Sequence, residues 1–187
     1  GKAGEVASQK GYGFADVEAR KPVDPSRTLF RPGSVSKLFT WTAVMQLVEQ
    51  GKLDLDDPVD RHLDFEIPET FPQKITVRHL LDHSAGFEDG YKDMFGASPD
   101  EYQELGPWLA SHIPARVREP GVEVSYSNYS TAVAGYIVQR ISGEDFSAYI
   151  DRHIFQPLGM TRSTFREPLP QSWQNDVAIG YEWKDGR

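Results

Sequence analysis

Ser34 and Lys37 are the two residues whose types and spacing could do chemistry. They lie three positions apart in Ser34-Val35-Ser36-Lys37, at the expected start of a helix, where side chains at i and i+3 share one face with Cβ atoms about 5–6 Å apart. A serine hydroxyl becomes an effective nucleophile when a neighbouring base takes its proton. Ser36 is one step from Lys37 and points elsewhere, so the spacing favours Ser34 as the nucleophile.

The pair also has an ordinary structural interpretation. Serine is a preferred N-cap residue, so Ser34 could simply begin a helix, with Lys37 as a solvated lysine in its first turn. A lysine acts as a base only when neutral, and burial or a helix N-terminus disfavours its charged form. Serine and lysine occur often at this spacing by chance. The chemical interpretation therefore needs a second element of sequence beside this one.

The elements that must position this pair are mostly helices. Tyr126-Ser127-Asn128 leads into one of them, and Gly143 would end it. Residues 4–17 are expected to form a β-hairpin arm, with residues 54–72 as a surface excursion. Apolar periodicity and capping residues predict helices over five ranges: 35–50, 76–82, 98–111, 129–142 and 146–155. Few strands remain to receive these helices, which indicates an incomplete sheet.

Composition excludes several classes of function. The chain has 187 residues with 20 basic and 28 acidic side chains, a net charge of −8, which disfavours nucleic-acid binding. It has no cysteine, so disulfides, thiolate metal sites and cysteine nucleophiles are excluded. No apolar run approaches the roughly 20 residues that cross a bilayer, and no signal peptide is visible.

Three segments in the same order make the pattern specific. The chain resembles the serine β-lactamase-related family, which includes class C β-lactamases, penicillin-binding carboxypeptidases, D-amino-acid peptidases and esterases. Shorter matches are Gly11-Tyr12-Gly13 and Pro157-Leu158-Gly159-Met160. The segments that carry the resemblance are Phe30-Arg31-Pro32-Gly33-Ser34-Val35-Ser36-Lys37, Leu80-Leu81-Asp82-His83-Ser84-Ala85-Gly86 and Pro120-Gly121 followed by Tyr126-Ser127-Asn128.

The resemblance implies roles for four side chains. Ser34 would attack a carbonyl and form an acyl-enzyme. Lys37 and Tyr126 would share the proton transfer as a coupled pair, with either of them as the base. Asn128 would hydrogen-bond Lys37 or the substrate's amide carbonyl. The backbone N–H of Ser34 would form half of the oxyanion hole.

The resemblance also implies a fold and a function. The expected fold is α+β and β-lactamase/transpeptidase-like, a helical region packed on an antiparallel sheet, in a single partial domain over residues 1–187. The expected activity is that of a serine hydrolase on an ester or amide of a small-molecule or peptide substrate, without metal or cofactor. The alternative is a non-catalytic protein that binds cell-wall peptide or a partner in the same cleft. A periplasmic or other extracytoplasmic location is implied, and the oligomeric state stays open.

The sequence departs from the family late in the chain. Family members carry a third motif, Lys-Thr-Gly or His-x-Gly, on a strand that closes the cleft and supplies the second oxyanion N–H. Lys184-Asp185-Gly186 follows Tyr126 too closely to be that motif. We therefore expect a fragment that lacks a first helix and strand and the C-terminal strands, and that alone is a weak or inactive catalyst.

Other candidate sites are weaker. His79 and His83 lie four positions apart but lack an evident third metal ligand, and His62, His112 and His153 look like surface or helix residues. The acids between Asp54 and Asp60 lack the glycine and glutamate of a calcium loop. Core packing and cleft lining are equally compatible with four aromatic residues: Tyr91, Phe95, Tyr102 and Trp108.

Overall fold

The computed structural model of the protein describes residues 3–90 and 103–181. The chain forms two compact units. One lies within residues 34–167, and the other combines the segments before and after that range. All four predicted site residues belong to the first of these units. The prediction of a single domain over residues 1–187 stays a prediction.

The smaller unit holds the described strands. Strand β1 (Phe14–Asp16) pairs antiparallel with β2 (Lys21–Pro22), with an irregular register between them. The hairpin predicted over residues 4–17 is thus displaced, because the segment expected to be a connection supplies the second strand. A bridge between Leu29 and Val177 joins the two segments of this unit, and the short 3₁₀ helix η5 (Gln171–Asp176) precedes it.

The larger unit begins at the helix that carries Lys37. Helix α1 (Lys37–Glu49) follows a 3₁₀ turn, η1 (Gly33–Ser36), so the predicted helix over 35–50 starts two residues later than expected. Its buried residues recur at three- and four-residue steps, which places one face against the core. These residues are Thr40, Ala43, Val44 and Leu47.

Helix α2 (Val77–Leu81) lies inside the range predicted for it. Thr76 caps it: the Thr76 side chain accepts from the backbone N–H of His79, and the backbone N–H of Thr76 donates to Nδ1 of His79 at 3.1 Å. His79 therefore takes the place that Glu or Gln usually holds in a capping box. The predicted excursion over 54–72 contains the 3₁₀ turn η2 (Val59–Arg61), which buried Val59 anchors.

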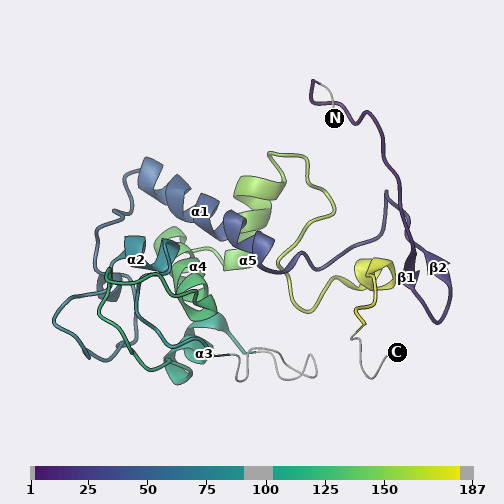
Figure 1. Ribbon diagram of the computed structural model, residues 1–187. Helices are drawn as coiled ribbons and strands as arrows, with labels where there is room; N and C mark the ends of the chain where they lie inside the picture. The colour runs from purple at the N-terminus through teal and green to yellow at the C-terminus, as the bar shows by residue number, and fades with distance from the viewer. Residues whose placement is uncertain (1–2, 91–102, 182–187) are drawn as a thin grey trace. The chain divides into compact units, whose positions relative to one another are not determined.

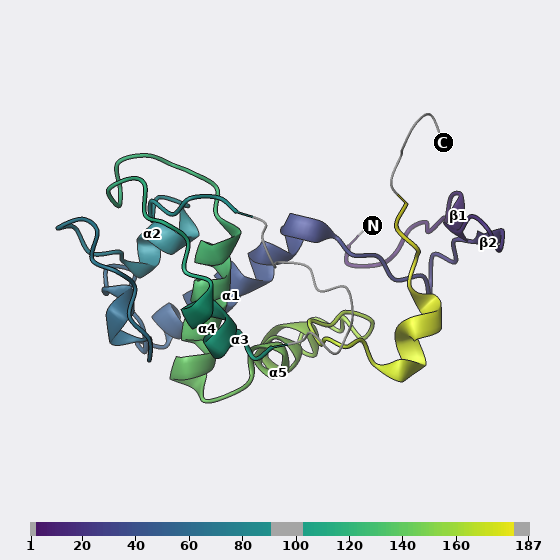
Figure 2. The ribbon, with the colours of Figure 1, turned by 90° about the horizontal axis from the view of Figure 1, so that it is seen from below.

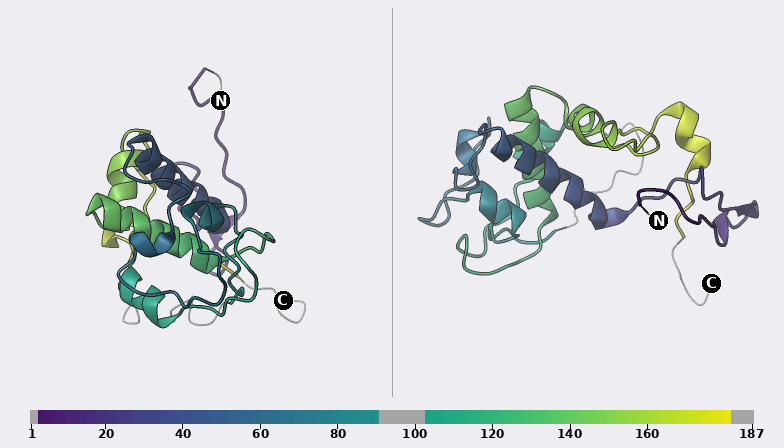
Figure 3. Two further views of the ribbon diagram at one scale, coloured as in Figure 1. Left: turned by 90° about the vertical axis from the view of Figure 1, so that its left-hand side faces the viewer. Right: turned by 90° about the horizontal axis from the view of Figure 1, so that it is seen from above.

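Helix α4 (Asn128–Ser142) is the centre of the larger unit; it ends where predicted and starts one residue earlier than expected. It contacts α1, α2, α3 and α5, and nine of its residues are buried. Figures 1 and 2 show α1 and α4 side by side, and the views of Figure 3 agree. Ser127 caps its start, and Gly143 ends it with a positive φ of 70°, a conformation that glycine adopts without strain.

Two further helices cover α4. Helix α3 (Leu105–Ser111) occupies the end of the predicted range 98–111, whose start lies partly outside the described residues. Helix α5 (Phe146–Ile150) continues into a π-helical turn, η4 (Asp151–Phe155), where the N–H of Gln156 donates to the carbonyl of Asp151. The predicted helix over 146–155 is therefore helical throughout but changes its hydrogen-bond pattern midway. Within the described residues, no helix is both long and apolar enough to cross a membrane.

Candidate active site

The 3₁₀ turn before α1 brings Ser34 and Lys37 together. Side chains at i and i+3 lie directly above one another in a 3₁₀ helix. The side chain of Lys37 therefore lies beside that of Ser34, although Ser34 precedes α1. Nζ of Lys37 lies 3.0 Å from Oγ of Ser34, a hydrogen-bond distance. The predicted contact between these two side chains is present, and Ser34 itself is exposed to solvent.

Ser34 does not cap α1. The N-cap position is held by Ser36, whose side chain makes no capping hydrogen bond to the helix. The structural interpretation of Ser34 as an N-cap is therefore wrong, since the 3₁₀ turn moves the start of the α-helix two residues along. The Ser34 hydroxyl is left to interact with other side chains.

Two segments that meet at an antiparallel bridge between Phe87 and Arg116 bring Tyr126 to this point from far along the chain. Residues 83–88 run beside residues 115–125, joined by backbone hydrogen bonds between Gly121 and Ser84 (2.9 Å) and between Val117 and Gly86 (2.9 Å). Gly86 has a φ of 82°, and a Cβ there would collide with the carbonyl of Arg118. Glycine is thus required where the segments come closest.

Tyr126 reaches Ser34 from the end of the second segment. The hydroxyl oxygen of Tyr126 lies 2.7 Å from Oγ of Ser34, and Nζ of Lys37 lies 4.8 Å from the centre of the Tyr126 ring. Burial acts to raise the pKa of Tyr126, but its interactions with Lys37 and Ser34 outweigh burial and hold the pKa below the usual value for tyrosine. The ionised form of Tyr126 is therefore more accessible than that of an ordinary surface tyrosine.

Asn128 fixes Lys37 from the first residue of α4. Nζ of Lys37 donates to Oδ1 of Asn128 at 2.6 Å, across 91 positions of sequence. Because α1 and α4 pack against each other, this hydrogen bond joins two helices of one core. The hydrogen bond predicted between Asn128 and Lys37 is present, and the one to a substrate carbonyl stays a prediction.

Side chains from two helix starts thus form one hydrogen-bonded cluster around the Ser34 hydroxyl. Oγ of Ser34 has two neighbours that can take its proton, Nζ of Lys37 and the oxygen of Tyr126. Asn128 accepts from Lys37 and so fixes the direction of one of them. This arrangement can ionise a serine hydroxyl and return a proton to a leaving group.

Sequence reasoning missed the contribution of His83. Its ring lies 4.7 Å from the Tyr126 ring and 5.8 Å from the Trp41 ring, centre to centre. Nδ1 of His83 accepts from the backbone N–H of Ser127 at 3.2 Å. The available signal was its place in the run Leu80–Gly86, which carries part of the family resemblance.

The other candidates have separate structural roles. His79 belongs to the capping box of α2, while His62 pairs with Asp57 at 3.2 Å and His153 pairs with Glu144 at 2.8 Å. Over residues 3–90 and 103–181, no three His, Asp or Glu side chains gather as a metal site would require. Trp108 stacks on His112. Three predicted aromatics lie outside the described residues: Tyr91, Phe95 and Tyr102.

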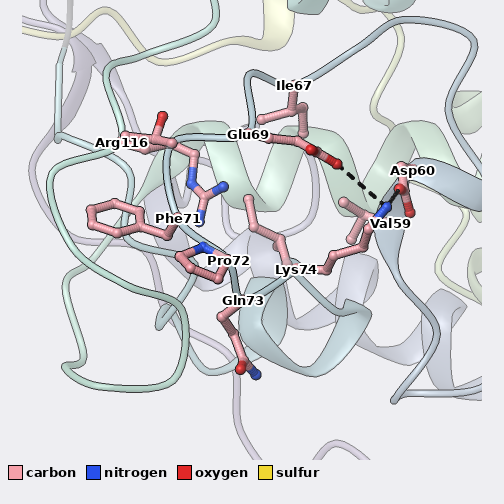
Figure 4. A pocket seen from close by; sticks show the side chains of 11 residues that line it. Val59, Asp60, Ile67, Glu69, Phe71, Pro72, Gln73, Lys74 and Arg116 are labelled. Atoms are coloured by element: carbon pink, nitrogen blue, oxygen red, sulfur yellow. Dashed lines mark hydrogen bonds and ion pairs between the residues drawn. The ribbon is translucent and has the colours of Figure 1, made fainter.

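A pocket of about 440 Å³ lies elsewhere in the larger unit, between residues 59–75 and Arg116 (Figure 4). The ammonium group of Lys74 lies between the carboxylates of Asp60 (2.5 Å) and Glu69 (3.6 Å). Arg116 packs its guanidinium 5.4 Å from the centre of the Phe71 ring. None of the side chains that line this pocket is a serine, and its charges largely offset one another.

Comparison with known proteins decides the family. The family model described as Beta-lactamase matches residues 1–185. The chain belongs to the Beta-lactamase family. It is 35% identical to a putative penicillin-binding protein, PbpX, of Bacillus subtilis, over 98% of this chain and 44% of PbpX. The chain thus spans less than half the length of that Beta-lactamase family relative.

Solved structures of the Beta-lactamase family agree. The octameric penicillin-binding protein homologue of Pyrococcus abyssi superposes with a TM-score of 0.81 at 33% identity, covering 98% of this chain and 43% of that one. EstCE1, described as a hydrolase with promiscuous acyltransferase activity, gives a TM-score of 0.75 at 29% identity, covering 90% of this chain and 46% of EstCE1. The predicted β-lactamase/transpeptidase-like α+β fold is confirmed.

Proposed function

We propose that the protein is a serine hydrolase that forms an acyl-enzyme through Ser34 on an ester or amide. The observation that carries this proposal is the position of the Ser34 oxygen, 3.0 Å from Nζ of Lys37 and 2.7 Å from the oxygen of Tyr126. A nucleophile needs a base within hydrogen-bond reach, and Ser34 has two groups that could serve.

The reaction proceeds in two steps. Oγ of Ser34 attacks the carbonyl carbon while its proton passes to Lys37 or Tyr126, and a tetrahedral oxyanion forms. The bond to the leaving group then breaks, and the same pair returns the proton to the departing alkoxide or amine. In the second step water attacks the resulting serine ester and loses a proton to the same pair. The bond between the acyl carbon and Oγ then breaks, the pair returns the proton to Oγ of Ser34, and the acid is released.

Lys37 and Tyr126 act together in this scheme. The lowered pKa of Tyr126 favours a tyrosinate that receives the serine proton, and the positive charge of Lys37, whose Nζ lies 4.8 Å from the ring centre, stabilises that anion. Asn128 holds Lys37 in place through its 2.6 Å hydrogen bond. We assign the base to the coupled pair and not to one member.

The oxyanion needs backbone donors. We assign one to the N–H of Ser34, and the family resemblance assigns the other to the strand of the third motif. Removal of one such donor lowers rates by about 10²–10³. We therefore expect the 187-residue chain alone to react slowly, and the tests below use the full-length polypeptide that contains it.

The proposed substrates are esters or short peptides, with an esterase or peptidase favoured over a dedicated β-lactamase because many reactions share these motifs. EstCE1 is titled as a hydrolase, which supports this class. An extracytoplasmic location is part of the proposal. The alternative function, binding of cell-wall peptide or a partner without turnover, is favoured by the penicillin-binding names of two relatives.

The proposal is tested by intact mass after exposure to a fluorophosphonate or a penicillin. The full-length protein should gain one adduct, and peptide mapping should place it on Ser34. Ser34→Ala should gain none. Ser36→Ala is the matched control, a serine two positions away, and should react like the wild type.

Two other results are informative. An adduct without turnover of any ester or amide would favour the binding function. No adduct on the full-length, folded protein with either reagent would overturn the assignment of Ser34 as a nucleophile.

A further inference from the structure

His83 makes contacts on both sides of Tyr126. Its carbonyl oxygen accepts from the backbone N–H of Ser125 at 2.8 Å, and its Nδ1 accepts from the backbone N–H of Ser127 at 3.2 Å. One residue thereby binds the N–H of the residue before Tyr126 and the N–H of the residue after it. Together these hydrogen bonds restrain the backbone at Ser125 and Ser127, on either side of Tyr126.

The ring of His83 also contacts the ring of Tyr126. Its centre lies 4.7 Å from the centre of the Tyr126 ring and 5.8 Å from that of the Trp41 ring of α1. Trp41 lies four positions after Lys37, on the same side of the helix. The ring of His83 therefore contacts both the helix that carries Lys37 and the segment that carries Tyr126.

The backbone at His83 is in an uncommon conformation. Its φ is 60°, the left-handed region that residues other than glycine seldom adopt. Such conformations persist where the surrounding structure enforces them, and they concentrate at functional sites. Here the turn allows the carbonyl and the ring of one residue to face the same neighbouring segment.

We infer that His83 is a positioning residue for the proposed acyl transfer, holding the Tyr126 hydroxyl against Ser34 through these two hydrogen bonds and its ring contact. The inference rests on the proposed function. Because Nδ1 accepts a hydrogen bond, the ring must be neutral with its proton on Nε2. A protonated ring has no acceptor for the Ser127 N–H, so protonation would release one side of Tyr126.

The charges around His83 favour this neutral form. Lys37 faces it from α1 and Asp82 from the end of α2, while the Tyr126 ring covers it from the segment before α4. Burial and then the positive charge of Lys37 lower the pKa of His83, and the opposing effect of Asp82 is smaller. Protonation is therefore expected below the ordinary histidine value of about 6.5.

The test compares two substitutions in the full-length protein. His83→Asn keeps an acceptor near the Nδ1 position, tolerates a positive φ and cannot be protonated. His83→Leu keeps bulk but removes the acceptor. The measurement is the second-order rate of Ser34 acylation by a fluorophosphonate between pH 5 and 9, with thermal unfolding of each variant.

His79→Asn is the matched control. His79 is also half-buried, also accepts a backbone N–H at Nδ1 and also has a pKa lowered chiefly by burial, but it caps α2 and does not contact Tyr126. It should lower the unfolding temperature while leaving the acylation rate unchanged.

We expect His83→Leu to lower the acylation rate at pH 8 by about 10- to 100-fold, since small misplacements of a catalytic group have effects of this size. His83→Asn, which retains an acceptor, should react faster than His83→Leu at this pH. The ratio of its rate to that of wild type should rise as the pH falls below about 6.5. Groups shared by both proteins cancel in this ratio.

The outcomes separate the two proposals. A wild type that forms no Ser34 adduct overturns the proposed function and this inference with it. A reactive wild type with a His83→Leu rate equal to that of His79→Asn overturns the inference alone. If His83→Leu does not fold, a pH-independent ratio for His83→Asn overturns it.

Discussion

The two helix starts that meet at the site use serine in opposite ways. At α4, Ser127 is 2% exposed and its side chain accepts from the backbone N–H of Ser130 at 3.1 Å, so the hydroxyl serves the fold. At α1, Ser34 is exposed and precedes the cap position, and its hydroxyl meets Lys37 and Tyr126 instead.

The difference lies in the local backbone. The Ser127 backbone is extended, with φ −140° and ψ 119°, which is the geometry of a capping serine. Ser34 lies in a 3₁₀ turn, which releases its side chain from the capping position. The same residue type therefore stabilises one helix and is available for chemistry at the other.

The largest effect is expected at Lys37. Lys37→Met keeps the length and apolar part of the side chain but removes the amine that contacts Ser34 and Asn128. Loss of a proton-transfer group lowers rates by about 10²–10⁴, so acylation of Ser34 should fall by about that factor. Stopped-flow or mass-resolved kinetics on the full-length protein measure it, and an unchanged rate would rule out Lys37 as part of the base.

The comparison of the two serines gives the next prediction. Ser127→Ala should lower the free energy of unfolding by about 1 kcal/mol, as loss of an N-cap does. Ser34→Ala should change it by less than about 0.5 kcal/mol, the usual range for an exposed site. Urea denaturation of both variants provides the measurement. Equal losses would show that Ser34 also serves the fold.

The smallest effect is a pH dependence that the two half-buried histidines impose on stability. Burial, the largest cause for each, lowers the pKa values of His79 and His83, so the unfolded chain binds more protons than the fold near the ordinary histidine pKa of about 6.5. The contribution of the two neutral histidines to the free energy of unfolding is then fully present above about pH 6.5, and it is lost as the pH falls below that value.

Thermal unfolding from pH 8 to pH 5 measures this slope. The double variant His79→Asn, His83→Asn should show a shallower fall than wild type over that interval. Carboxylates contribute to both proteins at the acidic end and cancel in the difference. An identical slope in the two proteins would contradict the assignment of this pH dependence to the histidines.

Parts of the fold and of the candidate site could be predicted from local sequence signals. The bounds of α4 follow from Ser127 as a cap and Gly143 as a stop, and the contact of Ser34 with Lys37 follows from a three-residue spacing. The Tyr126 contact with Ser34 spans 92 positions, and it was expected from a family resemblance and not from local physics.

What could not be predicted depends on tertiary contacts. The role of His83 requires two segments to pair, and their pairing depends on a close approach at Gly86 that no local pattern specifies. The strand β2 contains a proline and reads as a connection, yet it pairs with β1. The change from α to π geometry after Ile150 likewise has no local signal.

The most direct test of the account is to trap the intermediate during turnover. The full-length protein would be mixed with a p-nitrophenyl ester, quenched in acid within the first turnovers and mapped by peptide mass. The account predicts an acyl group on the peptide that contains Ser34, absent from Ser34→Ala and lost on longer incubation as the ester hydrolyses. Turnover with no acyl group on Ser34, or equal turnover by Ser34→Ala, would contradict it.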